Sequence, residues 1–338
     1  MMPATPQGLQ DVRRLVQPAL RAAVSRLDPT TCAVTGYHFG WPASDGAPAA
    51  ADGGKAVRPW LAMLSARAVG ADPEIAVPGA VAVELVHNFS LLHDDLIDSD
   101  TERRHRTTVW ARWGAPSAIL TGDALLALAQ EVLLDVPGPT GAAAARLLAV
   151  ATRELIRGQV EDMAYERRPE IDVTEVLAMA EAKTSALLSA SAAIGAVLSA
   201  APADAVAGLA DYGRHLGLAF QLVDDVLGIW GDPAFTGKPA RSDLRSRKTS
   251  LPVARVIGLG GPAATEVSTW LAGADEAGED LLDGIAEVLE EAGGRAWARQ
   301  QAAGHAAAAS AALDRVGAPA EVLAELRELA AFVVGREA

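Results

Sequence analysis

Apolar residues recur at helical spacing along most of the chain, and this pattern predicts a protein built of helices. The predicted helices span residues 10–27, 75–98, 119–134, 142–165, 173–200 and 204–230. Residues 251–338 read as further helix, interrupted at 258–262 and 293–294. Residues 28–54 are rich in Gly and Pro and are predicted to be a loop. The pattern shows no strand-rich region and no short-period repeat.

The helix predicted at 75–98 changes character at its end, where apolar residues give way to acids and then to arginines. Asp94 and Asp98 are four residues apart, so they share a helix face and repel each other unless a cation intervenes. Mg²⁺ suits such a site because it usually takes one or two carboxylates. Arg103 and Arg104 follow, and guanidinium groups bind phosphate well. A solvated helix end would not explain acids at the tip of an apolar helix, so the stretch predicts a diphosphate ester site.

The helix predicted at 204–230 repeats this arrangement near its end. Asp224 and Asp225 lie there, with Gln221 one turn earlier, and five Lys and Arg residues follow within 231–248. Two such clusters in one chain are improbable as accidents of solubility. They predict two carboxylate clusters that face each other across a helical bundle, with divalent ions and a diphosphate between them.

Two further stretches are weak signals by themselves. Residues 53–59, GGKAVRP, place Lys55 and Arg58 three apart, after two glycines that let the backbone approach a ligand. Lys183 and Thr184 lie within an apolar helix. Such a lysine either reaches solvent or faces a phosphate, and the sequence leaves both open.

Composition narrows the class of protein. The chain has 338 residues, 50% of them hydrophobic and only 4% aromatic, and it is rich in alanine, which favours closely packed helices over a β-sandwich. Its net charge of −14 argues against nucleic acid as a partner. A single cysteine, Cys32, and the lack of an apolar signal core favour the cytoplasm. The uncharged run 184–203 is interpreted as a buried core helix, so no transmembrane segment is expected.

In this order, the motifs resemble those of the trans-isoprenyl diphosphate synthases, the polyprenyl synthetase family. The matching elements are DDxxD at Asp94, Asp95 and Asp98, the pair Arg103–Arg104, GGKxxRP at 53–59, Lys183–Thr184, Phe220–Gln221, a second aspartate motif from Asp224–Asp225, GKP at 237–239, and SDLRSRKTSLP at 242–252. The resemblance covers nearly the whole chain and is strongest to a bacterial geranylgeranyl diphosphate synthase.

The resemblance implies an all-α fold, a helical bundle around a central cavity with the two aspartate-rich helices facing each other. It implies a single domain over 1–338, with an N-terminal helix and loop at 1–52 and a catalytic bundle at 53–338, and a homodimer. The implied reaction is the head-to-tail condensation of isopentenyl diphosphate with dimethylallyl, geranyl or farnesyl diphosphate. It is expected to need about three Mg²⁺ ions per active site, with Mn²⁺ as a candidate substitute.

The resemblance also assigns roles to individual residues. The implied catalytic residues are Asp94, Asp95, Asp98, Lys183, Asp224 and Asp225, of which Asp94, Asp98 and Asp224 would bind the metal. The residues implied to contact or lie near the allylic substrate are Arg103, Lys183, Thr184, Gln221, Lys238 and Lys248. Those implied to bind isopentenyl diphosphate are Lys55, Arg58, His87 and Arg104.

Two features refine this reading. Gly228 stands where the second motif normally ends in aspartate, and Asp232 lies one turn further on, which leaves open a weaker metal site. Phe89 and Ser90 precede the first motif at positions that limit product length in the family, with Phe89 about 7.5 Å along the helix from Asp94. One aromatic beside a small residue resembles the pattern for a geranylgeranyl (C20) product. Farnesyl and longer-chain products are the alternatives.

Other classes fit less well. A class I terpene cyclase would share the fold, but its second metal motif normally combines Asn or Asp with Ser or Thr and then Glu, unlike DDVLGIWGD. A metal-dependent phosphohydrolase, suggested by His87 and His93–Asp94, would leave the arginine pair and the second acidic cluster unexplained. A weakly active or regulatory subunit of a heteromeric synthase is the third alternative.

Overall fold

The computed structural model describes residues 7–41, 56–104, 106–165, 168, 171–233, 240–273 and 278–335. These residues form two compact units, which are treated separately below. Unit 1 comprises 1–152, 190–210 and 315–322, and unit 2 comprises 153–189, 211–314 and 323–338. Nearly all regular structure in the described ranges is helical, so the predicted all-α class is confirmed.

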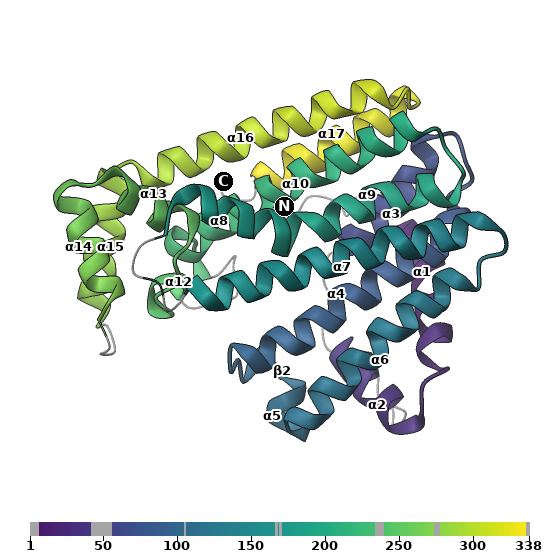
Figure 1. Ribbon diagram of the computed structural model, residues 1–338, viewed down its shortest axis with the longest axis horizontal. Helices are drawn as coiled ribbons and strands as arrows, with labels where there is room; N and C mark the ends of the chain where they lie inside the picture. The colour runs from purple at the N-terminus through teal and green to yellow at the C-terminus, as the bar shows by residue number, and fades with distance from the viewer. Residues whose placement is uncertain are drawn as a thin grey trace. The chain divides into compact units, whose positions relative to one another are not determined.

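Unit 1 is a set of helices around α4, with one short hairpin. Its elements are α1 (Gln7–Val24), α2 (Pro29–His38), α3 (Val57–Ala68), η1 (Pro73–Ala76), α4 (Val77–Ile97), β1 (Glu102–Arg103), β2 (Arg106–Thr107), α5 (Val109–Trp113), α6 (Ala115–Leu134) and the first part of α7 (Pro139–Tyr165), with most of α9 (Ala186–Leu198). In Figure 1, α4 and α6 run side by side, and β2 lies at the C-terminal end of α4.

Small residues let the helices of unit 1 approach closely. A side chain on Gly79 of α4 would meet Leu198 at 2.9 Å, and one on Gly195 of α9 would collide with the Ala62 carbonyl of α3. Ser65 donates to the Ala62 carbonyl and accepts a hydrogen bond from the Gly195 amide at 2.9 Å. The alanine-rich composition therefore produces close helix packing, as expected.

The segment 28–54 is not the simple loop that its Gly and Pro content predicts, because Pro29–His38 form α2. The Asp28 carboxylate accepts hydrogen bonds from the amides of Thr30 at 3.0 Å and Thr31 at 3.1 Å, which caps the helix. Pro29 fits the first turn because that position needs no amide donor. This N-terminal capping signal outweighs the glycines that follow.

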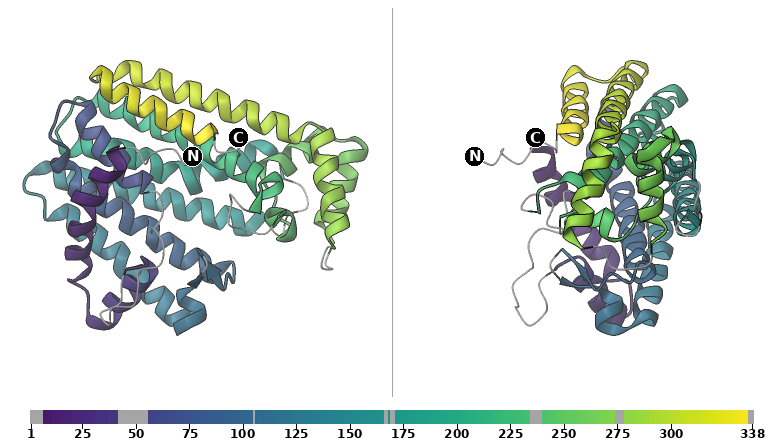
Figure 2. Two further views of the ribbon diagram at one scale, coloured as in Figure 1. Left: turned by 180° about the vertical axis from the view of Figure 1, so that it is seen from behind. Right: turned by 90° about the vertical axis from the view of Figure 1, so that its left-hand side faces the viewer.

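Unit 2 holds the remaining helices. Its elements are the end of α7, α8 (Val173–Ala180), the π-helical turn η2 (Glu181–Ser185), most of α10 (Ala203–Trp230), α12 (Ser242–Arg245), α13 (Leu251–Leu259), α14 (Gly261–Leu271), α15 (Glu279–Glu291), α16 (Gly294–Ala312) and most of α17 (Ala320–Val334), with η3 (Leu313–Arg315) between α16 and α17. In the views of Figures 1 and 2, α16 and α17 run side by side, and the buried hydroxyl of Tyr212 on α10 donates to the Leu326 carbonyl of α17 at 2.7 Å.

Two helices in the described residues are long and apolar enough to cross a membrane by length and composition. They are residues 73–97, 67% buried, and 115–134, 39% buried. Core helices of soluble proteins pass the same test. The run that the sequence singled out, 184–203, contains α9, whose side chains are mostly buried.

Candidate functional site

The C-terminal end of α4 carries the first acidic cluster. Asp94 is half-buried and Asp98 is exposed, one helical turn apart, and the Asp98 amide donates to the Asp94 carbonyl at 2.8 Å. Carboxylates at a helix C-terminus meet the negative end of the helix dipole. A bound cation would therefore stabilise this end of α4.

Asp95 points the other way, into the protein. Its side chain is 2% exposed, and one oxygen accepts a hydrogen bond from Nε of Arg103 at 2.6 Å. Burial raises the pKa of the Asp95 carboxyl, and the Arg103 guanidinium opposes that shift. In the structure, Asp95 fixes the position of the Arg103 side chain. The catalytic role predicted for Asp95 stays a prediction.

The predicted arginine pair lies on the short hairpin that follows α4. Glu102–Arg103 pair antiparallel with Arg106–Thr107. Arg104 lies at the turn with φ of +53°, in the left-handed region that non-glycine residues rarely adopt. Such strain tends to persist where the surroundings hold a side chain for a function.

Charged side chains gather around His87 on α4 in unit 1. Burial, followed by the nearby charges of Arg58 and Arg104, lowers the pKa of His87 well below its usual value, so its imidazole is neutral. Burial also raises the pKa of Glu84, one turn earlier, while Arg58 opposes the shift. The structure thus brings together three of the four residues predicted for isopentenyl diphosphate, and the fourth, Lys55, lies outside the described residues.

The acids of α4 fit Mg²⁺ rather than a metal held by protein alone. Within the described ranges, no three His, Cys, Asp or Glu side chains come together as a ready-made metal site. Mg²⁺ does not require one, because it keeps several waters and commonly shares its shell with substrate phosphate. An oxygen-only pair such as Asp94 and Asp98, with Asp98 exposed, matches that mode of binding.

Lys183 and Thr184 of unit 2 lie on the π-helical turn Glu181–Ser185. Two glycines allow this turn to be packed tightly, because a side chain on Gly158 of α7 would collide with the Lys183 backbone and one on Gly217 would come within 2.6 Å of Ser185. Lys183 Nζ donates to Asp162 at 2.6 Å. The lysine that could have been a solvent-reaching residue therefore faces an acid, and π-turns are common at functional sites.

A chain of hydrogen bonds links this turn to the second aspartate motif. Thr184 donates to Gln221 Oε1 at 2.7 Å, and Gln221 Nε2 donates to Asp225 Oδ1 at 2.8 Å. The other oxygen of Asp225 accepts from the Leu251 amide at 2.9 Å, and the residue is 2% exposed. Asp225 is thus a buried anchor, whereas Asp224 beside it is half-buried.

Lys248 completes a charged pocket in unit 2. Its Nζ lies 3.5 Å from Asp225 and 4.0 Å from Asp243, and these acids, Asp225 most of all, raise its pKa against the effect of burial. The pocket is lined among others by Asp162, Lys183, Thr184, Gln221, Asp225 and Lys248. Lys238, also predicted here, lies outside the described residues.

The space beside Gly228 is filled by Asp243 of α12. A side chain on Gly228 would collide with both oxygens and the carboxyl carbon of Asp243. A carboxylate therefore lies one helical turn from Asp224 although the motif lacks its last aspartate. Asp232, the substitute suggested by spacing, is exposed beyond the end of α10.

The two residues assigned to product length are buried in unit 1. The ring of Phe89, 5% exposed, meets that of His93 edge-on at 4.9 Å, and His93 Nε2 lies 3.2 Å from the Ile119 carbonyl of α6. Gly122 is required here because any side chain would collide with His93. Ser90 is 7% exposed and donates to the His87 carbonyl at 2.8 Å.

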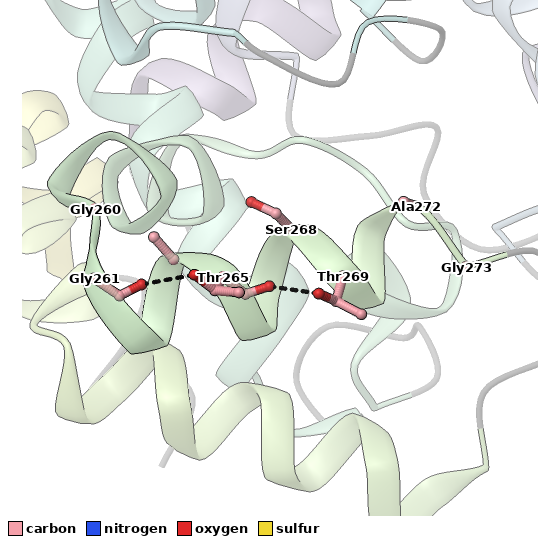
Figure 3. Close-up of a pocket in the computed structure, with 8 residues that line it drawn as sticks. Gly260, Gly261, Thr265, Ser268, Thr269, Ala272 and Gly273 are labelled. Atoms are coloured by element: carbon pink, nitrogen blue, oxygen red, sulfur yellow. Dashed lines mark hydrogen bonds between the residues drawn. The ribbon is translucent and has the colours of Figure 1, made fainter.

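A hollow along α14 is a poor candidate for this chemistry (Figure 3). Thr265 donates to the Gly261 carbonyl at 3.1 Å and Thr269 to the Thr265 carbonyl at 2.7 Å, so these hydroxyls serve the helix itself. None of the eight lining residues is charged.

Sequence reasoning missed Asp162 and Asp243, which lie beside Lys183 and Lys248 in unit 2, and His38 on α2. Asp162 and Asp243 stood within recognised stretches but received no role, and His38 lay in a segment predicted to be loop. Their roles depend on which helices meet, which no local pattern encodes. The prediction that both acidic clusters serve one substrate involves both units and stays a prediction.

The chain was compared with known proteins. It matches the family model described as polyprenyl synthetase over residues 47–289. It is 51% identical over 327 residues to (2E,6E)-farnesyl diphosphate synthase of Mycobacterium tuberculosis strain H37Rv, covering 96% of this chain and 91% of that protein. It is 41% identical over 314 residues to geranylgeranyl diphosphate synthase of the same strain, covering 92% of this chain and 89% of that protein.

Its structure is similar to the crystal structure of polyprenyl synthetase from Streptomyces coelicolor A3(2). The TM-score is 0.92 at 51% sequence identity, and the match covers 96% of this chain and 98% of that one. The similarity to these relatives and to the solved structure therefore extends over more than nine tenths of the chain.

Proposed function

Because the chain belongs to the polyprenyl synthetase family, we propose that it condenses isopentenyl diphosphate head-to-tail with an allylic diphosphate and releases diphosphate. It is a prenyltransferase, and its family is magnesium-dependent. The observation that carries the proposal is the end of α4, where Asp94 and Asp98 precede the hairpin of Arg103 and Arg104, and where Arg58 and Arg104 lie near His87.

The residues of this chain suit ionisation of an allylic diphosphate. When bound, Mg²⁺ neutralises the departing diphosphate, and Asp94, Asp98 and Asp224 would hold it. The basic groups Arg103, Lys183, Lys238 and Lys248, with Thr184 and Gln221, would bind the diphosphate. Fixed cations stabilise its charge more as the C–O bond breaks than before. Asp243 would supply the carboxylate that Gly228 lacks.

Isopentenyl diphosphate would bind through Lys55, Arg58, His87 and Arg104. Its double bond attacks the allylic cation, and the proton then lost passes to the released diphosphate. No protein nucleophile is needed. The role of the apolar helix faces is to keep water away from the cation.

For the product we propose geranylgeranyl diphosphate (C20). Phe89 and the small Ser90 support this length. Farnesyl diphosphate (C15) is the second candidate, favoured by the 51% identity to a farnesyl diphosphate synthase against 41% to a geranylgeranyl diphosphate synthase.

The direct test is incubation with Mg²⁺, isopentenyl diphosphate and each of the C5, C10 and C15 allylic diphosphates, followed by chromatography of the dephosphorylated products. We expect C15 or C20 alcohols from the protein alone and a loss of at least about 100-fold in kcat for Asp94→Asn/Asp98→Asn. Lack of product with every starter would overturn the proposal. Product that forms only with a partner protein would establish the heteromeric-subunit alternative.

We also propose that the protein is a cytoplasmic homodimer. The support is that α6 exposes large apolar side chains at both of its ends, where Ile119, Leu120 and Leu134 are 44%, 66% and 62% exposed. A second copy of the chain packed along α6 would remove these side chains from water.

A further inference from the structure

The C-terminal end of α2 forms one wall of an arginine-rich pocket in unit 1. His38 of α2 lines this pocket together with Arg103, Arg104 and Arg106 of the hairpin. Asp95 is the single acid among the lining residues, and it already accepts a hydrogen bond from Arg103 at 2.6 Å. Three guanidinium groups against one acid make the pocket a site for an anion.

His38, which lines this pocket, has one ring nitrogen whose hydrogen bond is not satisfied. Asn88 Nδ2 donates to the Glu84 carbonyl at 2.8 Å and to Glu84 Oε1 at 3.0 Å, which leaves Asn88 Oδ1 to accept a hydrogen bond from the His38 ring. Nε2 of His38 is buried and has no hydrogen-bond partner among the described residues. The bond to Asn88 therefore uses Nδ1, and Nε2 is the nitrogen left for a ligand.

Tyr37 fixes α2 against the hairpin and so fixes His38. Its hydroxyl donates to the Thr107 carbonyl at 2.8 Å, and its own carbonyl accepts from Arg106 at 2.7 Å. Its ring has Arg106 at 4.0 Å and Arg112 at 4.5 Å from the ring centre. These contacts hold the end of α2 in place before any ligand arrives.

The surrounding charges favour a neutral imidazole until an anion binds. Burial, then Arg103 and Arg104, lower the pKa of His38 to about 3, and Arg106 acts in the same direction. On α4, His87 is also held neutral. Arg58 on α3 and Arg104 on the hairpin act on both His87 and Glu84, and Arg103 also acts on His87.

We propose that His38 is a further binding residue for the diphosphate of isopentenyl diphosphate, with Nε2 hydrogen-bonded to a diphosphate oxygen. This rests on the proposed function. The anion offsets the guanidinium charges, so one proton from solvent enters the Nε2···O contact and is shared there, and no other bond forms or breaks. Binding at this pocket is therefore coupled to proton uptake.

The test is calorimetric titration of the full-length protein with inorganic diphosphate and with isopentenyl diphosphate at about pH 7.5. Divalent metal is removed with a chelator so that the metal-dependent allylic site stays empty. Repeating the titration in buffers of different ionisation enthalpy measures the protons taken up. We expect uptake by the native protein, and for His38→Gln we expect loss of that uptake with about tenfold weaker binding.

His305→Gln is the matched control, because His305 is a half-buried histidine of unit 2 that hydrogen-bonds to His215 at 2.9 Å. This variant should bind and take up protons like the native protein. His38→Asn is the second substitution in case His38→Gln does not fold. In turnover, both His38 variants should raise KM for isopentenyl diphosphate about tenfold while kcat and KM for the allylic substrate change little.

Unchanged binding and unchanged proton uptake in both His38 variants would overturn the proposal. Weaker binding with full proton uptake would also overturn it, because that result means a merely structural role. The binding measurement does not depend on turnover. A protein that binds diphosphate through His38 but makes no prenyl product would contradict the proposed function alone.

Discussion

Because Gly228 has no side chain, the Asp243 carboxylate of α12 can lie directly against α10. The hydrogen atom at this position leaves space for the Asp243 carboxylate, which also approaches Lys248 at 4.0 Å. A glycine within a helix is normally a cost, since it has more freedom in the unfolded chain. Here the lack of a side chain at Gly228 allows the Asp243 carboxylate to occupy its position.

Gly228→Ala should therefore destabilise the protein although alanine is the better helix former. We expect a loss of about 1–3 kcal/mol in the free energy of unfolding, because the new methyl group must displace Asp243. Gly284→Ala on α15, where nothing lies within 4 Å, is the matched control and should gain about 0.5–1 kcal/mol. Urea unfolding of both variants measures the difference, and equal effects would contradict this account.

Phe89→Ala should lengthen the products. Removal of the ring takes away the surface proposed to end the product cavity and also loosens His93, whose ring meets that of Phe89 edge-on. Such a deletion in a core costs about 3–5 kcal/mol of stability, so products should be compared below the unfolding temperature. Phe332→Ala, which removes a 47% exposed ring on α17, is the control. Unchanged product length would remove Phe89 from this role.

Among the elements, the long helices follow directly from apolar spacing, whereas two functional elements do not. Residues 75–98 and 204–230 were predicted within a few residues of α4 and α10. The π-helical turn that carries Lys183 and Thr184 has no local signature, since it depends on Gly158 and Gly217 packing against it. α2 had a signature, Asp28–Pro29, that the following glycines obscured.

The first turn of α2 should depend on its cap. Asp28→Ala removes the acceptor for the Thr30 and Thr31 amides, so these amides should exchange hydrogen with solvent several-fold faster. Asp28→Asn keeps an acceptor oxygen and should exchange at nearly the native rate. Hydrogen exchange followed by mass spectrometry of the peptide covering 24–41 tests this. Equal exchange in both variants would mean that Tyr37 alone holds the helix.

For the whole molecule, two neutral and half-buried histidines in unit 1, His38 and His87, make stability depend on pH. The pKa of His38 is about 3 in the folded protein, and that of His87 is well below 6.5, whereas both lie near 6.5 in the unfolded chain. Below about pH 6.5 the unfolded state therefore binds more protons than the folded state. The contribution of these two histidines to the free energy of unfolding therefore falls as pH decreases.

Comparison of the native protein with His38→Gln isolates one of these groups. As pH falls from about 7 to about 4, the native protein should lose up to about 1.4 kcal/mol per pH unit more than the variant. Below about pH 3 the difference should level off, because His38 is then protonated in both states. Urea unfolding at fixed protein concentration measures it, and parallel pH curves would contradict the assigned pKa.

The exposed apolar side chains of α6, Ile119, Leu120 and Leu134, concern the assembly of the whole molecule. If a second copy covers them, Leu120→Glu should convert the dimer to a monomer, which light scattering after gel filtration would detect. Val150→Glu is the control. It places the same charge at a 46% exposed position on the next helix, α7, and should leave the dimer intact. A native protein that is monomeric at micromolar concentration would exclude a dimer contact through α6.

The second acid of each aspartate pair is occupied inside the protein, Asp95 by Arg103 and Asp225 by Gln221 and the Leu251 amide. A letter-by-letter motif search gives both aspartates of a pair equal weight, yet the inner one is matched to a specific companion. During divergence, Asp95 and Arg103 should therefore be exchanged together or not at all. A related protein that keeps both aspartates but lacks Arg103 or Gln221 would still match the motif, although its inner aspartate would have lost a hydrogen-bond partner.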